Sequence, residues 1–326
     1  MRAVAEARTN IALVKYWGKR DARLNLPAVG SLSLTLDGLS TRTEVRFDDS
    51  LTADELVLNG AAASGEPLRR VTKFLDLVRE QSDRGERARV VSSNDFPTAA
   101  GLASSASAFA ALALAATHAA GVALSPRELS VLARRGSGSA ARSIFGGFVE
   151  MHRGSLEGGE DAFAEPLDGA QALDVRLVVA VTSDAAKETL STDGMRQTME
   201  TSPYYAAWVQ TSAGDIAEAK RAIAARDLEL LGVVTERSCL AMHASAMASR
   251  PAVVYFTGAT IEGYRAIQRL RKSGVPAWFT CDAGPHVKAL TDGKHADEVA
   301  QRLAEVPGVL RARVCAPGAA AKVIES

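Results

Sequence analysis

Apolar positions recur at helical spacing in several stretches of the chain. In residues 66–81 they share one face, which predicts an amphipathic helix that buries Leu68, Val71, Phe74, Leu75 and Val78. Residues 104–120 are almost wholly small and apolar, which predicts a helix buried on all sides. Helical periodicity in the second half of the chain predicts four more helices, at residues 203–225, 227–247, 263–273 and 294–306.

Other stretches have the pattern of β-strands. Residues 31–36 and 41–47 alternate small or polar with apolar side chains, and residues 175–181 form a continuous apolar run. Short runs of similar character predict further strands at residues 88–92, 145–151, 277–281 and 308–315. Because strands and helices follow one another without a strict strand–helix–strand rhythm, the predicted fold class is α+β. We place a boundary near residue 185, which gives a first domain of residues 1–185 and a second of residues 186–326.

Composition and charge agree with two domains and exclude several classes of protein. A chain of 326 residues that is 47% hydrophobic can form two ordinary cores. Lys plus Arg and Asp plus Glu each number 38, so the zero net charge argues against nucleic acid or an anionic membrane as the main partner. The three cysteines lack metal-ligand spacing and are odd in number, which argues against a zinc site or a disulfide framework. Residues 1–10 lack the apolar run of a signal peptide, and no stretch reaches the ~20 apolar residues that span a bilayer, so we expect a cytoplasmic protein.

The first segment with candidate chemistry is residues 96–107, where a loop containing Gly101 leads into the small-residue helix. The N-terminus of a helix presents unpaired N–H groups and a partial positive charge, and small side chains allow an anion to approach the backbone. Ser104, Ser105 and Ser107 add hydroxyl groups, one of which could ligate Mg²⁺. The alternative is a serine-capped core helix that follows a tight turn.

The second segment, residues 10–21, places Lys15, Lys19 and Arg20 beside two aromatic residues and a glycine. Such a group of cations predicts a site for an anionic substrate. The alternative is a solvated basic turn without a ligand.

The third group of polar residues has two parts. Residues 136–143 combine serine hydroxyls and backbone amides with Arg142, whose guanidinium can bind a carboxylate through two parallel hydrogen bonds. Asp282 follows a predicted strand and precedes Gly284 and Pro285, which places it on a turn at the end of that strand. The alternatives are a surface arginine and an aspartate that only caps a turn.

Together these segments resemble one family of phosphate-transferring enzymes. The run Pro97-Thr-Ala-Ala-Gly101-Leu-Ala-Ser-Ser-Ala resembles the ATP-phosphate loop of the GHMP kinases. Residues 10–21, 136–143 and 279–285 resemble segments of the diphosphomevalonate decarboxylases within that superfamily. The resemblance extends from about residue 6 to 290. It implies the two-domain GHMP kinase fold, with a ribosomal-protein-like N-terminal domain and a ferredoxin-like C-terminal domain, and an ATP-dependent decarboxylation of mevalonate 5-diphosphate.

The resemblance also implies a role for individual residues, ATP and Mg²⁺ as cofactors, and a homodimer. The implied catalytic residues are Asp282, Lys15 and Arg142. The implied substrate-binding residues, besides Arg142, are Tyr16, Lys19, Ser137, Gly138, Ser139 and Ser191. The implied ATP-binding residues are Ser92, Asn94, Pro97, Gly101, Leu102, Ala103, Ser104, Ser105 and Ser107, with Ser105 as the Mg²⁺ contact.

The chain departs from the family pattern at three places. Ala28-Val29-Gly30-Ser31 stands where the family commonly has an asparagine and two serines, His286 where it has asparagine, and Thr192 where bacterial members often have arginine. The departures at residues 28–30 and at His286 leave two alternatives on the same fold, whereas the change at Thr192 decides little. One is a decarboxylase of mevalonate 5-phosphate, and the other is a kinase of the mevalonate 3-hydroxyl. A nucleotide-binding regulator without catalysis is a third hypothesis, against which the joint presence of Lys15, Arg142 and Asp282 argues.

Overall fold

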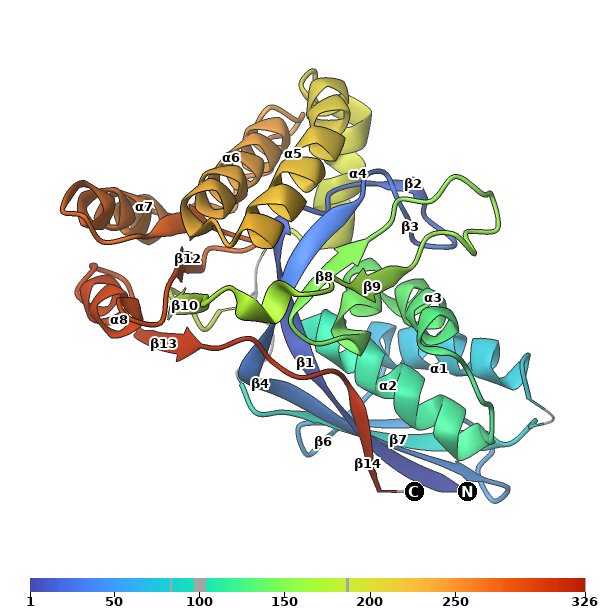
Figure 1. Ribbon diagram of the computed structural model, residues 1–326. Helices are drawn as coiled ribbons and strands as arrows, with labels where there is room; N and C mark the ends of the chain where they lie inside the picture. The colour runs from blue at the N-terminus through green and yellow to red at the C-terminus, as the bar shows by residue number, and fades with distance from the viewer. Residues whose placement is uncertain (83, 97–103, 186–187, 326) are drawn as a thin grey trace.

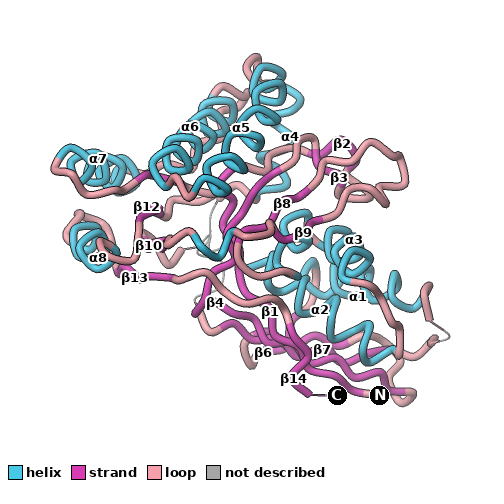
Figure 2. The backbone as a smooth tube through the Cα atoms, viewed as in Figure 1, coloured by secondary structure: helices cyan, strands magenta, loops and turns pink. Residues whose placement is uncertain are grey.

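Two antiparallel-rich sheets and their helices form two domains (Figure 1). The computed structural model describes residues 1–82, 84–96, 104–185 and 188–325. The secondary structure is the α+β mixture that the sequence predicts. Figure 2 shows the strands of the larger sheet running together toward the two chain ends, with the helices of the second domain gathered at the opposite end of the molecule.

The larger sheet is built around two long antiparallel strands, β1 and β4. Its central order is β14-β1-β4-β7-β5-β6, and β8 pairs with β4 and β9. The two strands predicted at residues 31–36 and 41–47 form one continuous strand. Its pairing with β1 shifts register between them, and there Gly38 takes a φ of +75°. Glycine tolerates this conformation, so the strand continues past the irregularity. The strands of this sheet are β1 (Arg2–Val14), β4 (Ser31–Asp48), β5 (Glu55–Leu58), β6 (Ala61–Ala63), β7 (Arg87–Asn94), β8 (Phe148–Met151), β9 (Ala164–Pro166) and β14 (Lys322–Glu325).

The strand β14 comes from the end of the chain and pairs antiparallel with β1. The two termini therefore lie side by side at the foot of the larger sheet (Figure 1). The sequence did not predict this strand, because four residues are too few to show a strand pattern or to indicate which distant strand they pair with.

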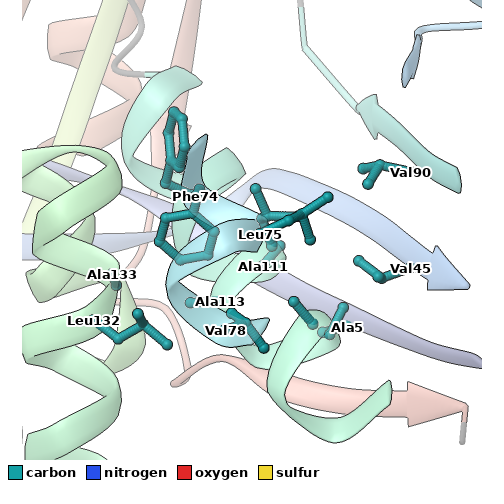
Figure 3. Close-up of a cluster of buried hydrophobic side chains, with 14 of the residues drawn as sticks. Ala5, Val45, Phe74, Leu75, Val78, Val90, Ala111, Ala113, Leu132 and Ala133 are labelled. Atoms are coloured by element: carbon teal, nitrogen blue, oxygen red, sulfur yellow. The ribbon is translucent and has the colours of Figure 1, made fainter. Parts of the chain in front are cut away.

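Three helices and a 3₁₀ segment cover one face of the larger sheet. They are α1 (Glu66–Arg79), α2 (Ser104–Ala120), α3 (Pro126–Gly136) and η1 (Gly138–Ile144). Figure 3 shows Phe74 and Leu75 of α1 and Ala111 of α2 packed between these helices and the strand residues Val45 and Val90. The alanines of α2 have no bulk, so this helix lies directly on β1 and β4 with its interior face fully buried. The predicted helices at 66–81 and 104–120 are confirmed.

The second sheet has the order β11-β12-β10-β13 and is antiparallel throughout. Both faces of β10 are covered: Leu177 and Val179 face the core shared with α5, α6 and β1, while Val178 and Ala180 face α7 and α8. This double burial explains why residues 175–181 are continuously apolar. The strands are β10 (Arg176–Val181), β11 (Trp278–Thr280), β12 (Val287–Thr291) and β13 (Arg311–Cys315).

Four helices of the second domain lie close to the predicted ranges, and a further helix at residues 191–201 was not predicted. The helix predicted at 263–273 begins earlier, because Thr257 and Thr260 form a capping box before it. The helices are α4 (Ser191–Thr201), α5 (Tyr205–Ala225), α6 (Leu228–Met247), α7 (Gly258–Lys272) and α8 (Ala296–Ala304). A small hairpin of β2 (Lys19–Asp21) and β3 (Leu26–Pro27) and a 3₁₀ turn, η2 (Ala170–Ala172), complete the secondary structure of the described residues. Within those residues, every helix is too short or too polar to cross a membrane.

Candidate active site

A cleft of about 1010 Å³ lies between the two domains. From the first domain, it is lined by the end of β1, the β2–β3 hairpin, α1, the first turn of α2 and the segment around η1. From the second, it is lined by the first turn of α4, by α6 and by the turn that follows β11. The three segments that the sequence singled out therefore meet at one place.

The floor of this cleft is formed by Lys15, Arg142 and Asp282. Asp282 lies on the turn after β11, as predicted, and its Oδ1 accepts a hydrogen bond of 2.9 Å from the Nζ of Lys15. Lys15 also donates to the carbonyl of Ala12, and it is only 1% exposed. Burial alone would raise the pKa of Asp282, but the nearby charges of Lys15 and Lys288 hold it well below its ordinary value. Asp282 is therefore a carboxylate throughout the physiological pH range.

Lys288, on β12, is a second cation beside the same carboxylate. Its Nζ lies 3.1 Å from the Oδ2 of Asp282, and the residue is 1% exposed. Sequence reasoning missed it. The only signal was a single charged residue inside the apolar run of residues 287–290, where a lysine is rarely buried unless it is paired.

Arg142 is buried at the floor and fixed by two partners. Its Nε donates to Asn10 at 2.9 Å and its Nη1 to the hydroxyl of Ser31 at 2.7 Å. Asn10 in turn donates to Ser143 and to the carbonyl of Ser139, so the guanidinium is held in one orientation. Burial lowers the pKa of Arg142 to about 10, against the opposing effect of Asp282. Asn10 and Ser31 are positioning residues that the sequence did not identify, although both lie in or beside segments it singled out.

Some N–H donors of the Arg142 guanidinium are not used in hydrogen bonds to the described residues. Its Nη2 has no hydrogen-bond acceptor among the described residues, and the side chain lines the cleft. A buried arginine without a carboxylate partner can bind an anionic ligand with two charged hydrogen bonds.

The predicted substrate-binding residues all line the cleft. They are Tyr16, Lys19, Ser137, Gly138, Ser139 and Ser191. Burial raises the pKa of Tyr16 to about 12, and its hydroxyl is enclosed without a hydrogen-bond partner among the described residues. A Cβ at Gly138 would overlap the hydroxyl end of the Tyr16 ring, so a larger residue there would require the ring to shift. Arg20, by contrast, points elsewhere and donates to the carbonyl of Leu156.

The predicted ATP-binding residues fall into three groups. Ser104 and Ser105, in the first turn of α2, line the cleft. Ser92, Asn94 and Ser107 lie together away from its lining, where Thr41 bonds to both Asn94 and Ser107 and Thr43 bonds to Ser92. Pro97, Gly101, Leu102 and Ala103 lie outside the described residues. The ATP-binding role of all nine stays a prediction.

The wall of the cleft carries more positive charge than the sequence analysis expected. Among the described residues, eight cations line it against three acids, Glu66, Asp193 and Asp282. Arg70 is exposed and donates to the carbonyl of Gly136. Arg69 and Lys73 are exposed on the same helix. The cations are Lys15, Lys19, Arg23, Arg69, Arg70, Lys73, Arg135 and Arg142. We call Arg23, Arg69 and Lys73 the rim.

Two of the three departures from the family pattern lie in packed regions. Val29 is buried in an apolar cluster with Trp17 and Met195. A Cβ at Gly30 would lie 2.9 Å from the terminal methyl of Ile216 and 3.0 Å from the carbonyl oxygen of Met151, so a serine there would require these neighbours to shift. His286 is 1% exposed and accepts from the backbone of Thr182.

The third departure, Thr192, is exposed and lines the cleft beside Ser191. It is the one departure of the three that can touch a ligand directly.

The donor set fits a nucleotide–magnesium complex better than a resident metal ion. The described residues contain no group of three or more His, Cys, Asp or Glu side chains that could hold a metal. Mg²⁺ is usually bound by few protein oxygens together with substrate phosphates. The hydroxyls of Ser104 and Ser105 and the start of α2 offer such a place.

The two-domain arrangement and the cleft define a protein of the GHMP kinase fold. A model of the diphosphomevalonate decarboxylase-like N-terminal domain matches residues 7–164, and one of the mevalonate 5-diphosphate decarboxylase C-terminal domain matches residues 177–313. The chain belongs to the diphosphomevalonate decarboxylase family.

Curated relatives and solved structures agree. A diphosphomevalonate decarboxylase of Candida albicans is 37% identical to this chain. The alignment covers 94% of this chain and 90% of the Candida protein. Mevalonate diphosphate decarboxylase from Staphylococcus aureus has a TM-score of 0.94 at 39% identity, covering 99% of this chain and 98% of its own. MDDEF in complex with MVAPP, AMPPCP and magnesium has a TM-score of 0.94 at 38% identity, covering 100% and 99%.

Proposed function

We propose that the protein catalyses the ATP-dependent decarboxylation of mevalonate 5-diphosphate to isopentenyl diphosphate, with ADP, phosphate and CO₂ as the other products. The observation that carries this proposal is the floor of the cleft. There, a carboxylate paired with a buried lysine faces the same space as a buried arginine that lacks a carboxylate of its own. The family to which the chain belongs supports the same reaction.

The reaction needs a better leaving group than hydroxide at C3 of the substrate. ATP, when bound, supplies the phosphoryl group that converts the 3-hydroxyl into such a leaving group. Asp282 accepts the hydrogen bond of that hydroxyl and orients its oxygen. Because its pKa is held low, Asp282 acts mainly by orientation and charge rather than as a strong base.

Arg142 and Lys15 act on the charges of the substrate. Arg142 binds the C1 carboxylate, and its rigid attachment to Asn10 and Ser31 keeps that carboxylate in line for loss as CO₂. Lys15 keeps Asp282 ionised and stabilises negative charge that develops beside it. Tyr16, Lys19 and the hydroxyls of Ser137, Ser139 and Ser191 bind the diphosphate.

The nucleotide is held on the α2 side of the cleft. Ser104 and Ser105 lie in the first turn of α2, where backbone N–H groups favour phosphate, and Ser105 is the proposed Mg²⁺ contact. Arg70 and Lys73 of α1 add positive charge to the cleft. We also propose Pro97, Gly101, Leu102 and Ala103 as the phosphate loop, and Ser92, Asn94 and Ser107 as part of the nucleotide site.

The alternatives of a monophosphate substrate or of phosphorylation alone are not favoured. The relatives that match the chain are named for the diphosphate reaction. The two departures that raised these alternatives, at residues 28–30 and 286, lie in packed regions rather than in the cleft lining.

Three wider features of the protein are also proposed. The boundary between residues 1–185 and 186–326 would place the phosphate loop in one domain and Asp282 in the other. A cytoplasmic location agrees with the three cysteines, which are all free thiols. The homodimer rests on the family resemblance, and sedimentation of the purified protein tests it.

The proposed function is tested by parallel assays with ATP, Mg²⁺ and either mevalonate 5-diphosphate or mevalonate 5-phosphate. We expect kcat/KM for the diphosphate to exceed that for the monophosphate by at least about 100-fold, since the second phosphate adds charge-assisted hydrogen bonds. A preference for the monophosphate would assign the protein to the alternative reaction.

A further inference from the structure

Asp282 lies between two buried lysines that contact different oxygens of its carboxylate. Lys15 binds Oδ1 at 2.9 Å, and Lys288 lies 3.1 Å from Oδ2. Lys15 and Asp282 line the cleft, whereas Lys288 is not among the residues that line it. The Oδ2 atom is enclosed and accepts no hydrogen bond of standard geometry among the described residues, so its contact with Lys288 is an ion pair; the Asp282 side chain as a whole is 22% exposed. The carboxylate therefore presents its other side to the cleft and has Lys288 behind it.

We propose that Lys288 is a positioning residue for the reaction, which holds the rear oxygen of Asp282 so that the front oxygen faces the substrate's 3-hydroxyl. This inference rests on the proposed function. A buried ammonium is costly unless it is paired, and the described structure gives Lys288 one ion-pair partner, Asp282. Its place on β12, in the centre of a rigid sheet, suits a support that has to hold an orientation.

The charge of Lys288 has a second consequence, which is protection of the carboxylate from protonation. Removing this cation should raise the pKa of Asp282, because an opposite charge at this distance favours the ionised form. Protonated Asp282 cannot serve as the charged acceptor, so activity should then decrease at acid pH. Above about pH 5 the two histidines near Asp282 are neutral, since burial lowers the pKa of each to about 3. The titratable and charged groups around Asp282 are Lys15, Arg142, Lys288, His243, His286, Cys239 and Cys281.

The experiment compares Lys288→Met, Lys288→Arg and wild type in the full chain, with mevalonate 5-diphosphate, ATP and Mg²⁺. For Lys288→Met we expect kcat to fall by about 10- to 100-fold, as misplacement of a catalytic group does, with KM changed less than about threefold. The ratio of its rate at pH 5.5 to that at pH 7.5 should fall below the wild-type ratio. Lys288→Arg keeps the charge and should restore that ratio. Lys220→Met, which breaks the Lys220–Glu150 ion pair outside the cleft, should match wild type.

A double-mutant cycle separates positioning from a general effect on the fold. If Lys288 acts through Asp282, then Lys288→Met should change the residual rate of Asp282→Asn by less than about threefold. A loss of the same size in both backgrounds would overturn the proposal, and so would a Lys288→Met enzyme with wild-type kcat and pH ratio. Thermal unfolding of each variant shows whether it is folded. If Lys288→Met is unfolded, the test rests on Lys288→Arg, whose ratio of rates at pH 5.5 and pH 7.5 should equal that of the wild type. An inactive wild-type protein would instead refute the proposed function.

Discussion

Positive charge is held in two different ways at the floor and on the rim of the cleft. At the floor, Lys15 and Arg142 are 1% and 3% exposed, and hydrogen bonds to protein atoms fix each of them. On the rim, Lys73 is exposed, and the side chain of Arg69 is 76% exposed and paired with Glu66 in the same helix. Water and salt weaken the exposed charges, whereas the buried ones act at nearly full strength in a fixed geometry. We infer that the floor performs the chemistry and the rim mainly attracts the anionic ligands.

The largest expected effect is that of removing the carboxylate at the floor. Asp282→Ala should lower kcat by at least about 1000-fold, because the hydroxyl loses its acceptor and two buried lysines lose their partner. ATP binding, measured by calorimetry, should persist. The matched control is Asp193→Ala, an exposed acid on the same cleft, which should keep most of the wild-type rate. An Asp282→Ala enzyme with more than about a tenth of the wild-type rate would contradict the floor's role.

Arg142→Lys should have the next largest effect. A lysine keeps the charge but cannot bind Asn10, Ser31 and a substrate carboxylate at once, so we expect kcat/KM to fall by about 100-fold or more. Steady-state kinetics with varied mevalonate 5-diphosphate measure it. Arg135→Lys, at a partly exposed arginine of the same cleft, serves as the control. Unchanged kinetics in Arg142→Lys would remove this residue from the site.

The rim should respond to salt rather than to geometry. The double variant Arg69→Ala/Lys73→Ala should raise the KM values of the anionic ligands, mevalonate 5-diphosphate and ATP, by about three- to tenfold. We expect little change in kcat, because exposed charges act mainly on ligand capture. The ratio of the variant's KM to the wild-type KM should decrease between 50 and 300 mM salt, because screening weakens the rim charges of the wild type. A large fall in kcat would instead place the rim in the chemistry.

The smallest effects should distinguish two serines of α2. Ser105 is exposed on the cleft, so Ser105→Ala should raise KM for ATP severalfold without changing the melting temperature. Ser107 is fully buried and bonded to Thr41, so Ser107→Ala should destabilise the fold by about 1 kcal/mol and should raise KM for ATP less than Ser105→Ala does. Nucleotide titrations and thermal melts of both variants measure the difference. A larger rise in KM for ATP in Ser107→Ala would show that its hydroxyl reaches the nucleotide.

The sequence predicted the parts of this structure that depend on local pattern. The helix α1 and the helix α2 were predicted to within two residues, because burial of one face leaves a periodic apolar stripe and burial of nearly the whole helix leaves an unbroken apolar run. Lys15, Arg142 and Asp282 were found because short motifs resemble a family. The structure adds that they share one floor, across separations of up to 267 residues.

What the sequence missed depends on contacts between distant segments. The pairing of β14 with β1 and the contact of Lys288 with Asp282 have no local periodicity. The charged wall of the cleft was missed for the same reason, since Arg70 reads as part of the polar face of an amphipathic helix. The buried position of Ser107 could not be predicted either, because Thr41 comes from a strand 66 residues away.

The most direct measurement of the central claim is the ratio of CO₂ to ADP formed by the wild-type protein from mevalonate 5-diphosphate labelled at its C1 carboxylate. The floor, with Arg142 directed at a carboxylate and Asp282 at a hydroxyl, predicts a ratio of about one from the first turnover onward, since the two groups act on one substrate molecule. ADP formed without labelled CO₂ would contradict the account, because it would reduce the protein to a kinase of the 3-hydroxyl.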